Sequence, residues 1–269
     1  MNPSTSNNSE RSMLQVHPIP AFEDNYFWLF HQQGQRQAFV VDPGAGQPVL
    51  AALAARDLTL AGILVTHHHG DHTGGIGQLL AAGRVPVYGP PSIAQVSRPL
   101  REGDCLTLAE GLEFEVIEVP GHTLDHIAYF GHGGDAPLLF SGDTLFAGGC
   151  GRLFEGSAAQ MFDSLGKLAA LPGDTRVYCA HEYTLANLRF ALAVEPDNPA
   201  LQARFTREQA KRRDQHPTLP STLALELATN PFLRSHQPSI INAAQAHARA
   251  TLAEPAEVLA AVRAWKDGF

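Results

Sequence analysis

Charge, lysine and cysteine are all scarce in this sequence. Only 17% of its 269 residues are charged, and lysine and cysteine occur three times each. Cys105, Cys150 and Cys179 are an odd number without CxxC spacing, which favours reduced thiols and a cytoplasmic protein over a disulfide-stapled secreted one. With so few lysines, any that belongs to a functional site should be easy to recognise.

Long apolar runs are also missing. No stretch reaches the roughly 18–20 uncharged residues that a membrane-spanning helix needs, so we expect no membrane partner. The formal net charge of −8 argues against an extended nucleic-acid surface, which would need clustered lysine and arginine. Residues 1–12 are small and polar without a basic start or an apolar stretch, which predicts a disordered tail rather than a secretory signal.

The sequence does contain enough apolar material, 44% of its residues, for one large domain or two modest ones. In the first part of the chain, short β-type runs alternate with helical stretches, which predicts a layered α/β domain. The expected strands are 14–20, Tyr26–His31, 37–42, Ala61–Thr66, Val85–Tyr88, Glu113–Val119, Ile127–Phe130, Leu138–Ser141 and Arg176–Cys179. The expected helices are 47–56 and 158–171.

The pattern changes after about residue 183. Apolar residues recur at helical spacing through Thr184–Val194, Asn198–His216 and Glu254–Trp265, with prolines between these stretches. This predicts a second, mostly helical unit.

Histidine is the abundant residue that needs an explanation, because four of the thirteen lie within six positions. They occur in THHHGDHTGG, directly after an apolar strand. His67 and His69 are two apart and point the same way on an extended backbone. Asp71 and His72 follow, and neighbouring glycines allow the tight backbone that brings them together. Imidazole and carboxylate groups at this spacing are typical of a site for zinc, iron or manganese.

Three further candidates each stand where a β-type run ends. These are His122 in PGHT, Asp143 in SGDT, and His181 in CAHE. Strand ends hold side chains on a rigid scaffold while facing a common mouth. Together with the first cluster they make five histidines and two aspartates, which is enough for a two-metal site.

This order of motifs resembles the metallo-β-lactamase superfamily. A tighter resemblance, to the glyoxalase II (hydroxyacylglutathione hydrolase) family, rests on further motifs in the same order. They are IPAFEDNYFW (19–28), GGCGRLFEG (148–156), CAHEYTLANLRFA (179–191), NPFLR (230–234) and RAWKD (263–267). The resemblance covers the chain from about residue 13 to its last residue.

The resemblance implies a metallo-β-lactamase αββα sandwich at 13–182, followed by a smaller, mostly helical glutathione-binding domain at 183–269. It implies two divalent metal ions per chain, with zinc expected first and iron or manganese also compatible. The implied ligands are His67, His69 and His122 for the first ion, Asp71, His72 and His181 for the second, and Asp143 as a bridge between them.

The resemblance also implies the reaction. The family hydrolyses S-(2-hydroxyacyl)glutathione thioesters, chiefly S-D-lactoylglutathione to D-lactate and glutathione, as the second step of methylglyoxal detoxification. A hydroxide shared by the two ions would be the nucleophile, with Asp71 and Asp143 as catalytic residues. The implied tripeptide contacts are Arg152, Tyr183, Arg263 and Lys266. We expect a cytoplasmic monomer that binds a small-molecule thioester and neither nucleic acid nor membrane.

Some positions depart from the family pattern or carry no ligand role. Arg152 stands where the family commonly has lysine, and Phe154 where many relatives have tyrosine, so one hydroxyl contact to glutathione should be missing. We expect His68 to point away from the cluster and His126 to orient nearby groups. Cys150 lacks a paired base and is interpreted as a packing residue.

Other functions fit the sequence less well. A mononuclear-iron persulfide dioxygenase would not need the full ligand set or RAWKD. A lactonase or β-lactamase would not need the helical unit, and the acidic balance disfavours a nuclease. A non-enzymatic binding module would have to bind glutathione thioesters without turnover.

Overall fold

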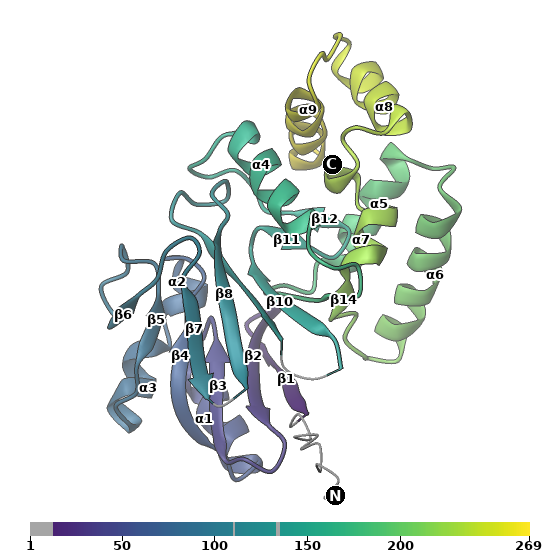
Figure 1. Ribbon diagram of the computed structural model, residues 1–269. Helices are drawn as coiled ribbons and strands as arrows, with labels where there is room; N and C mark the ends of the chain where they lie inside the picture. The colour runs from purple at the N-terminus through teal and green to yellow at the C-terminus, as the bar shows by residue number, and fades with distance from the viewer. Residues whose placement is uncertain (1–12, 110, 133–134) are drawn as a thin grey trace, which may run out of the picture.

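The computed structural model describes residues 13–269 except 110, 133 and 134, so the expected tail at 1–12 lies outside the described residues. Two six-stranded sheets form the centre of the molecule (Figure 1). The first sheet runs, in spatial order, through β1 (Leu14–Ala21), β2 (Asn25–Gln32), β3 (Gln37–Val41), β4 (Thr59–Leu64), β5 (Val87–Gly89) and β6 (Arg98–Pro99). The second runs through β14 (Ser221–Thr222), β13 (Arg176–Cys179), β10 (Pro137–Gly142), β9 (Ile127–His132), β8 (Leu112–Glu118) and β7 (Cys105–Ala109).

Strand β2 shows why the sheets pack as layers. Its side chains alternate between two apolar clusters, because successive residues of a strand point to opposite faces. Trp28 and Phe30 pack between the sheets with Phe114 and Phe140 of the second sheet. Leu29 faces the other way, into the cluster formed with the helices outside the first sheet. The strand is therefore buried on both faces.

Helices cover both outer faces of the two sheets. α1 (Gly46–Ala55) and α3 (Ile76–Ala82) contribute apolar side chains to the cluster outside the first sheet. α4 (Ala158–Ala169) packs outside the second sheet, where Ser157 and Gln160 form a capping box at its start. This order of layers confirms the expected αββα sandwich.

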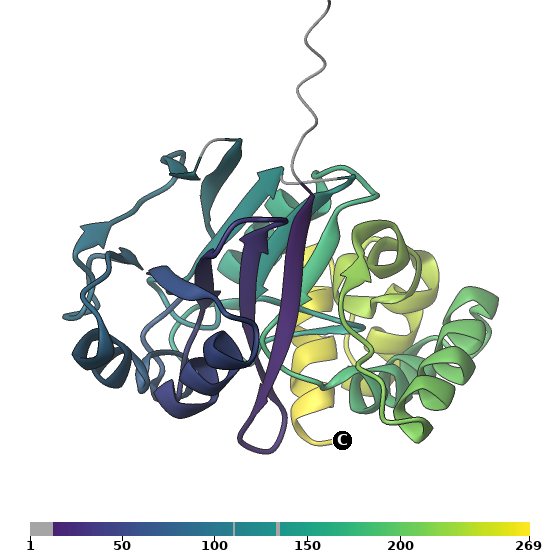
Figure 2. The same cartoon turned by 90° about the horizontal axis from the view of Figure 1, so that it is seen from below.

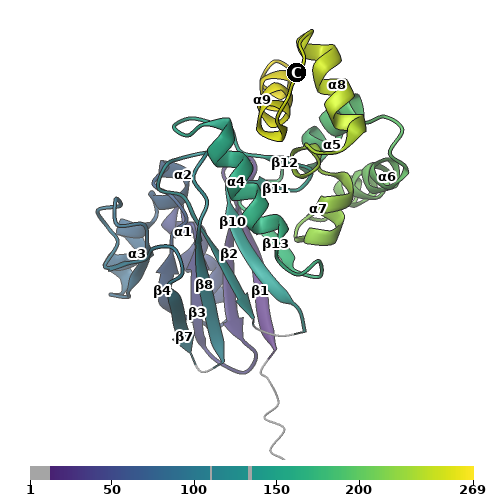
Figure 3. The same cartoon turned by 45° about the horizontal axis from the view of Figure 1, so that its top comes forward.

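The C-terminal helices gather on one side of the sandwich (Figure 2). They are α5 (Thr184–Val194), α6 (Pro199–Arg213), α7 (Leu223–Thr229), the 3₁₀ helix η1 (Pro231–Leu233), α8 (Pro238–Ala248) and α9 (Pro255–Asp267). α4 lies between the second sheet and α9, so its cluster joins the sandwich to the helical unit (Figure 3). No helix in the described part of the chain is long and apolar enough to cross a membrane.

The sequence patterns located most of these elements within a few residues and missed the shortest. The glycine-rich segment after His69 is not only a loop, since it forms α2 (Gly70–Thr73) and leads into α3. β7, α7 and α8 were also not expected, and neither was the two-stranded β11 (Leu145–Phe146) and β12 (Gly149–Cys150). All of these except α8 are too short to carry several periods of the apolar pattern. α8 has eleven residues but buries only Ile240 and Ala244, so its apolar stripe is weak.

Side chains of the helical unit hold the β11–β12 turn from outside. Asn187 donates to the carbonyl of Ala147 at 3.0 Å, and Glu226 accepts from the amide of Gly148 at 2.7 Å. Asn230 donates to the carbonyl of Gly149 at 2.9 Å. Because this turn joins β10 to Arg152, the helical unit fixes the segment that crosses the mouth of the sandwich.

A buried ion pair anchors that arrangement. Arg204, in α6, is 1% exposed, and its guanidinium donates to Glu226 at 2.5 Å and to Thr229 at 2.6 Å. Ser221 also donates to Glu226. Glu226 thus connects α6 and α7 to the β11–β12 turn.

We predict that Arg204→Ala lowers the free energy of unfolding by about 3–5 kcal/mol, because it leaves the Glu226 carboxylate buried without its cation. Arg36→Ala is the matched control, since Arg36 and its partner Asp57 are both mostly exposed and their pair should contribute only about 0–1 kcal/mol. Guanidinium unfolding measures both. Equal stability of the two variants would contradict the role given to the buried pair.

Candidate metal centre

The expected metal ligands lie at one edge of the sandwich, where several strands end. β4 leads into His67 and His69, and α2 directly afterwards carries Asp71 and His72. The other three follow the carboxyl ends of β8, β10 and β13, and are His122, Asp143 and His181. Rigid strands therefore deliver side chains from distant parts of the sequence to one place.

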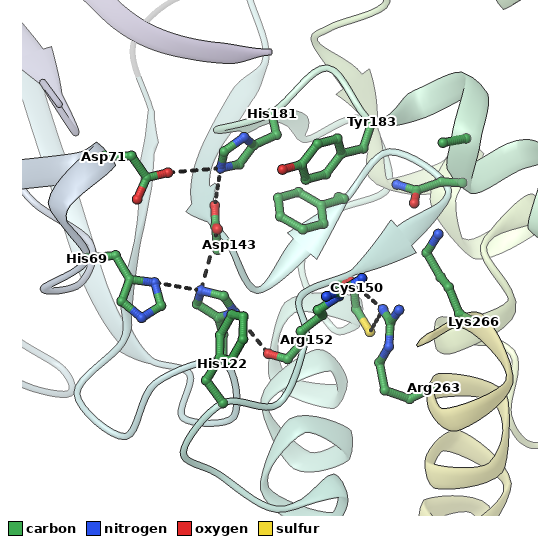
Figure 4. A pocket seen from close by; sticks show the side chains of 14 residues that line it. His69, Asp71, His122, Asp143, Cys150, Arg152, His181, Tyr183, Arg263 and Lys266 are labelled. Carbon is green, nitrogen blue, oxygen red and sulfur yellow. Dashed lines mark hydrogen bonds and ion pairs between the residues drawn. The ribbon is translucent and has the colours of Figure 1, made fainter. Parts of the chain in front are cut away.

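Three imidazoles form the first cluster. Nδ1 of His69 lies 3.1 Å from Nε2 of His67 and 3.1 Å from Nε2 of His122. One nitrogen from each ring therefore faces a common point, as Figure 4 shows for His69 and His122.

Asp71, His72 and His181 form the second cluster. Oδ2 of Asp71 lies 3.4 Å from Nε2 of His72 and 3.6 Å from Nε2 of His181. Asn25 donates to the same oxygen at 3.1 Å and so holds the carboxylate in this direction.

Asp143 lies between the clusters and turns one oxygen to each. Its Oδ1 is 3.4 Å from Nε2 of His181 and 3.5 Å from Nε2 of His72, while its Oδ2 is 3.5 Å from Nε2 of His122. Gly142 permits this position, because its φ is +48° and a Cβ there would lie 2.5 Å from Oγ1 of Thr66.

These separations fit two metal ions. Donors that surround one zinc ion tetrahedrally at about 2.0–2.1 Å stand about 3.3 Å from one another. The separations within the two clusters are 3.1–3.6 Å. In the described part of the chain, the buried Nε2 of His72 and Oδ1 of Asp143 have no hydrogen-bond partner, and unpartnered buried polar atoms are costly. Bound cations would satisfy both.

The ring nitrogens that face away from the clusters lie beside oxygen atoms, in hydrogen bonds for His122 and His181 and in an ion-pair contact for His72. Nδ1 of His122 lies 2.9 Å from the carbonyl of Arg152, and Nδ1 of His181 lies 2.8 Å from Asp24. Nδ1 of His72 lies 3.1 Å from Asp42. Such outer partners fix the orientation of a metal-ligating imidazole.

Asp24, Asn25 and Asp42 are not among the residues that the sequence patterns predict for the site. Two signals could have found them, since Asp42 ends an expected strand and the other two stand in the EDNYFW motif. Thr66 donates to Asp42 through both its amide and its hydroxyl at 2.7 Å, which orients the carboxylate toward His72.

Burial prepares the first cluster for a metal. It lowers the pKa of His67, His69 and His122, so these imidazoles are neutral near pH 7. A neutral imidazole is the form that binds a metal ion.

The second cluster instead favours positive charge. Burial lowers the pKa of His72, but Asp143 and Asp42 outweigh it and raise that pKa well above its usual value. Burial raises the pKa of Asp143, yet His72 and His181 hold it well below its usual range. The same carboxylate field would stabilise a metal ion.

The two other histidines of these motifs lie outside the clusters. His68 points to Asp125 and Glu155, at 3.0 and 3.2 Å. His126 is fully buried, and its Nε2 accepts from the amide of Asp143 at 3.0 Å. Burial lowers the pKa of His126 to about 3, so the ring stays neutral and can accept that bond.

A cavity of about 550 Å³ extends from the clusters toward the helical unit. His69, Asp71, His122, Asp143 and His181 form one wall (Figure 4). The other wall carries the side chains expected to contact the tripeptide: Arg152, Tyr183, Arg263 and Lys266. The structure thus brings both predicted sets of residues to one cavity.

The three cations reach this cavity in different ways. Arg263 is buried, with 4% of its surface exposed. Its guanidinium donates to the carbonyl of Cys150 at 2.8 Å and to Asp267 at 3.0 Å. Arg152 is exposed. Lys266 is half-buried above the ring of Phe190, and burial, with Arg263 nearby, lowers its pKa to about 8.

Phe154, Cys150 and Tyr183 line the same cavity without carrying a charge. Phe154 is 63% exposed, and its ring, which has no hydroxyl, lies edge-on to His69 and His122. Cys150 is buried, which raises the pKa of its thiol and removes it as a nucleophile. Tyr183 stacks on His181 at 4.7 Å between ring centroids.

Comparison with solved structures identifies the fold class. ETHE1 from Myxococcus xanthus superposes with a TM-score of 0.62 at 27% identity, over 94% of this chain and 98% of that one. A di-iron-bound form of TTHA1623 gives 0.58 at 28% identity, over 81% and 100%. The metallo-beta-lactamase superfamily model matches residues 24–181. The chain is therefore a metallo-β-lactamase-fold protein.

The C-terminal helical unit shows which family within this superfamily the chain resembles. The model for the hydroxyacylglutathione hydrolase C-terminus matches residues 182–269. A hydroxyacylglutathione hydrolase from Alkalilimnicola ehrlichii is 57% identical over 95% of this chain and 99% of its own length. The chain belongs to the hydroxyacylglutathione hydrolase family, and the family and the clusters together support a dependence on divalent metal.

We predict that Asp24→Ala weakens metal binding about 10–100-fold, because His181 loses the partner that orients its ring. Asp174→Ala removes an exposed carboxylate in the loop before β13 and is the control. Competition titration against a chelator measures both variants. Asp24→Ala with the affinity of the unmodified protein would contradict this role.

Proposed function

We propose that this chain hydrolyses S-(2-hydroxyacyl)glutathione thioesters, chiefly S-D-lactoylglutathione, to a 2-hydroxy acid and glutathione. One observation carries the proposal most directly, namely that a single cavity joins the two ligand clusters to three cationic side chains. The clusters suit hydrolysis of a carbonyl compound, and the cations suit an anionic tripeptide. This reaction would be the second step of methylglyoxal detoxification.

The two clusters would hold two divalent metal ions per chain. His67, His69 and His122 would hold the first, Asp71, His72 and His181 the second, and Asp143 would contact both. Nitrogen and oxygen donors accept zinc, our first expectation, as well as iron or manganese, and the related TTHA1623 has been solved with two irons. Bound divalent metals lower the pKa of water and polarise a carbonyl group.

The chain's own residues would position the reactants. Asp71 has an oxygen held by Asn25 and a half-exposed carboxylate at the cavity wall, where it can orient water toward the carbonyl carbon. Asp143 fixes the spacing of the two clusters. The leaving thiolate needs little help from an acid, because thiols titrate near 8.5.

The glutathione half would lie along the helical wall. Arg263 and Lys266 would bind one carboxylate of the tripeptide, and Arg152 would bind at the more exposed rim. Burial raises the pKa of Tyr183 to about 12, so its hydroxyl stays protonated and can donate to the peptide. Residues 13–182 would thus supply the catalytic domain and 183–269 the glutathione-binding domain.

We further propose a cytoplasmic monomer. Every residue of the proposed site comes from one chain, and the three cysteines are free, as expected in a reducing compartment.

Hydrolysis of S-D-lactoylglutathione, measured together with metal content, tests this function. We expect turnover at two ions per chain, and loss of both metal and turnover in Asp143→Ala. A fully metallated protein without turnover would contradict the proposal, and retention of two ions by Asp143→Ala would contradict the bridging role. Oxygen uptake with a glutathione persulfide would favour the dioxygenase instead.

We also predict a pH dependence of KM. Lys266 is charged below its pKa of about 8 and loses its charge above it. KM for the thioester should therefore rise several-fold between about pH 7 and pH 9. Lys266→Arg should abolish this rise, because arginine stays protonated throughout this range. Identical KM profiles for the two proteins would contradict the assignment of Lys266.

A further inference from the structure

A second recess, of about 390 Å³, opens on the side of the clusters that faces the β1–β2 hairpin. Asp71, His181 and Tyr183 line both this recess and the main cavity. The recess therefore meets the main cavity at the ligand clusters. Its own wall is the hairpin turn that begins at Phe22.

The turn is tied firmly to the metal centre. Ala21 pairs with Asn25 across the hairpin, and the amide of Glu182 donates to the carbonyl of Asp24 at 2.8 Å. The side chain of Asp24 meets His181, and that of Asn25 meets Asp71. The turn therefore keeps its place relative to the clusters.

Phe22 is unusual within this turn. Its φ is +51°, a left-handed conformation that bulky residues rarely adopt, and the residue is 61% exposed. The ring rests edge-on against Phe27, 6.0 Å between centroids. An exposed aromatic residue held in a strained conformation beside a site points to a contact with a ligand.

The charge of the recess is opposite to that of the main cavity. Glu23 and Asp24 line it, and no lysine or arginine is among the described residues that do so. The main cavity has three cations, of which Arg263 and Lys266 lie on α9 and Arg152 follows β12. A substrate that spans the recess and the main cavity would place its anionic half in the main cavity, toward the helices.

We infer that this recess binds the acyl group of the thioester and selects neutral acyl chains, aromatic ones included, over chains that end in a carboxylate. The inference rests on the function proposed above. With glutathione along the cationic wall and the thioester carbonyl at the clusters, the acyl chain leaves the clusters on the remaining open side. There Phe22 offers an apolar face, and Glu23 repels a terminal carboxylate.

The first experiment compares two thioesters of matched length, S-butyrylglutathione and S-succinylglutathione, on the metal-loaded protein. We expect kcat/KM to be at least fivefold higher for the neutral butyryl group. Glu23→Gln should reduce this ratio at least threefold, and Glu23→Lys should reverse it. Glu115→Gln, an exposed glutamate of β8, should leave the ratio as it is.

The second experiment measures binding without turnover. Titration calorimetry with S-benzylglutathione and S-methylglutathione, which are not hydrolysed, should show that Phe22→Ala loses at least fivefold in affinity for the benzyl compound relative to the methyl one. An equal loss for both compounds, or none, would overturn the aromatic contact.

Different outcomes contradict the proposed function and the proposed selectivity of the recess. If neither thioester is hydrolysed, the proposed function is wrong, and the calorimetric ratio still decides whether the recess binds the S-substituent. If both are hydrolysed and the Glu23 variants keep the ratio of the unmodified protein, the function stands and the selectivity inference is overturned.

Discussion

The position of the Asp143 carboxylate is the constraint on which the rest of this site depends. Its two oxygens face different groups of imidazoles, His72 and His181 on one side and His122 on the other. A carboxylate so deeply buried is costly unless positive charge lies beside it. Gly142 lets the chain turn there, and His126 holds the amide of Asp143. The end of β10 thus sets how the two clusters lie relative to each other.

The helical unit forms the far wall of the cavity that opens from these clusters. Through Glu226 and Asn230 it fixes the β11–β12 turn, which carries the chain from Asp143 toward Arg152. Through α9 it places Arg263 and Lys266 opposite the clusters. In the proposed function neither unit alone would surround an anionic thioester, since the His/Asp clusters lie in the sandwich and two of the three cavity cations lie on α9.

The sequence predicted the parts of this arrangement that are local. His and Asp residues that follow the end of a β-type run are visible in a single sequence, so the candidate ligands could be predicted. The alternation of strands and helices, with the family resemblance, predicted the order of layers. Contacts between distant segments could not. The hydrogen bond between Asp24 and His181 joins residues 157 positions apart, and no local sequence pattern predicts it. The burial of Arg263 against Cys150 and the recess beside Phe22 likewise depend on how the two units and the hairpin pack.

Anomalous X-ray scattering from metal-loaded crystals tests the central claim most directly, because it locates each ion independently of activity. The account predicts two peaks on opposite sides of Asp143, each about 2.0–2.2 Å from its ligands. One would lie among His67, His69 and His122, and the other among Asp71, His72 and His181. A single peak, or a peak at His68 and Asp125 instead, would contradict it.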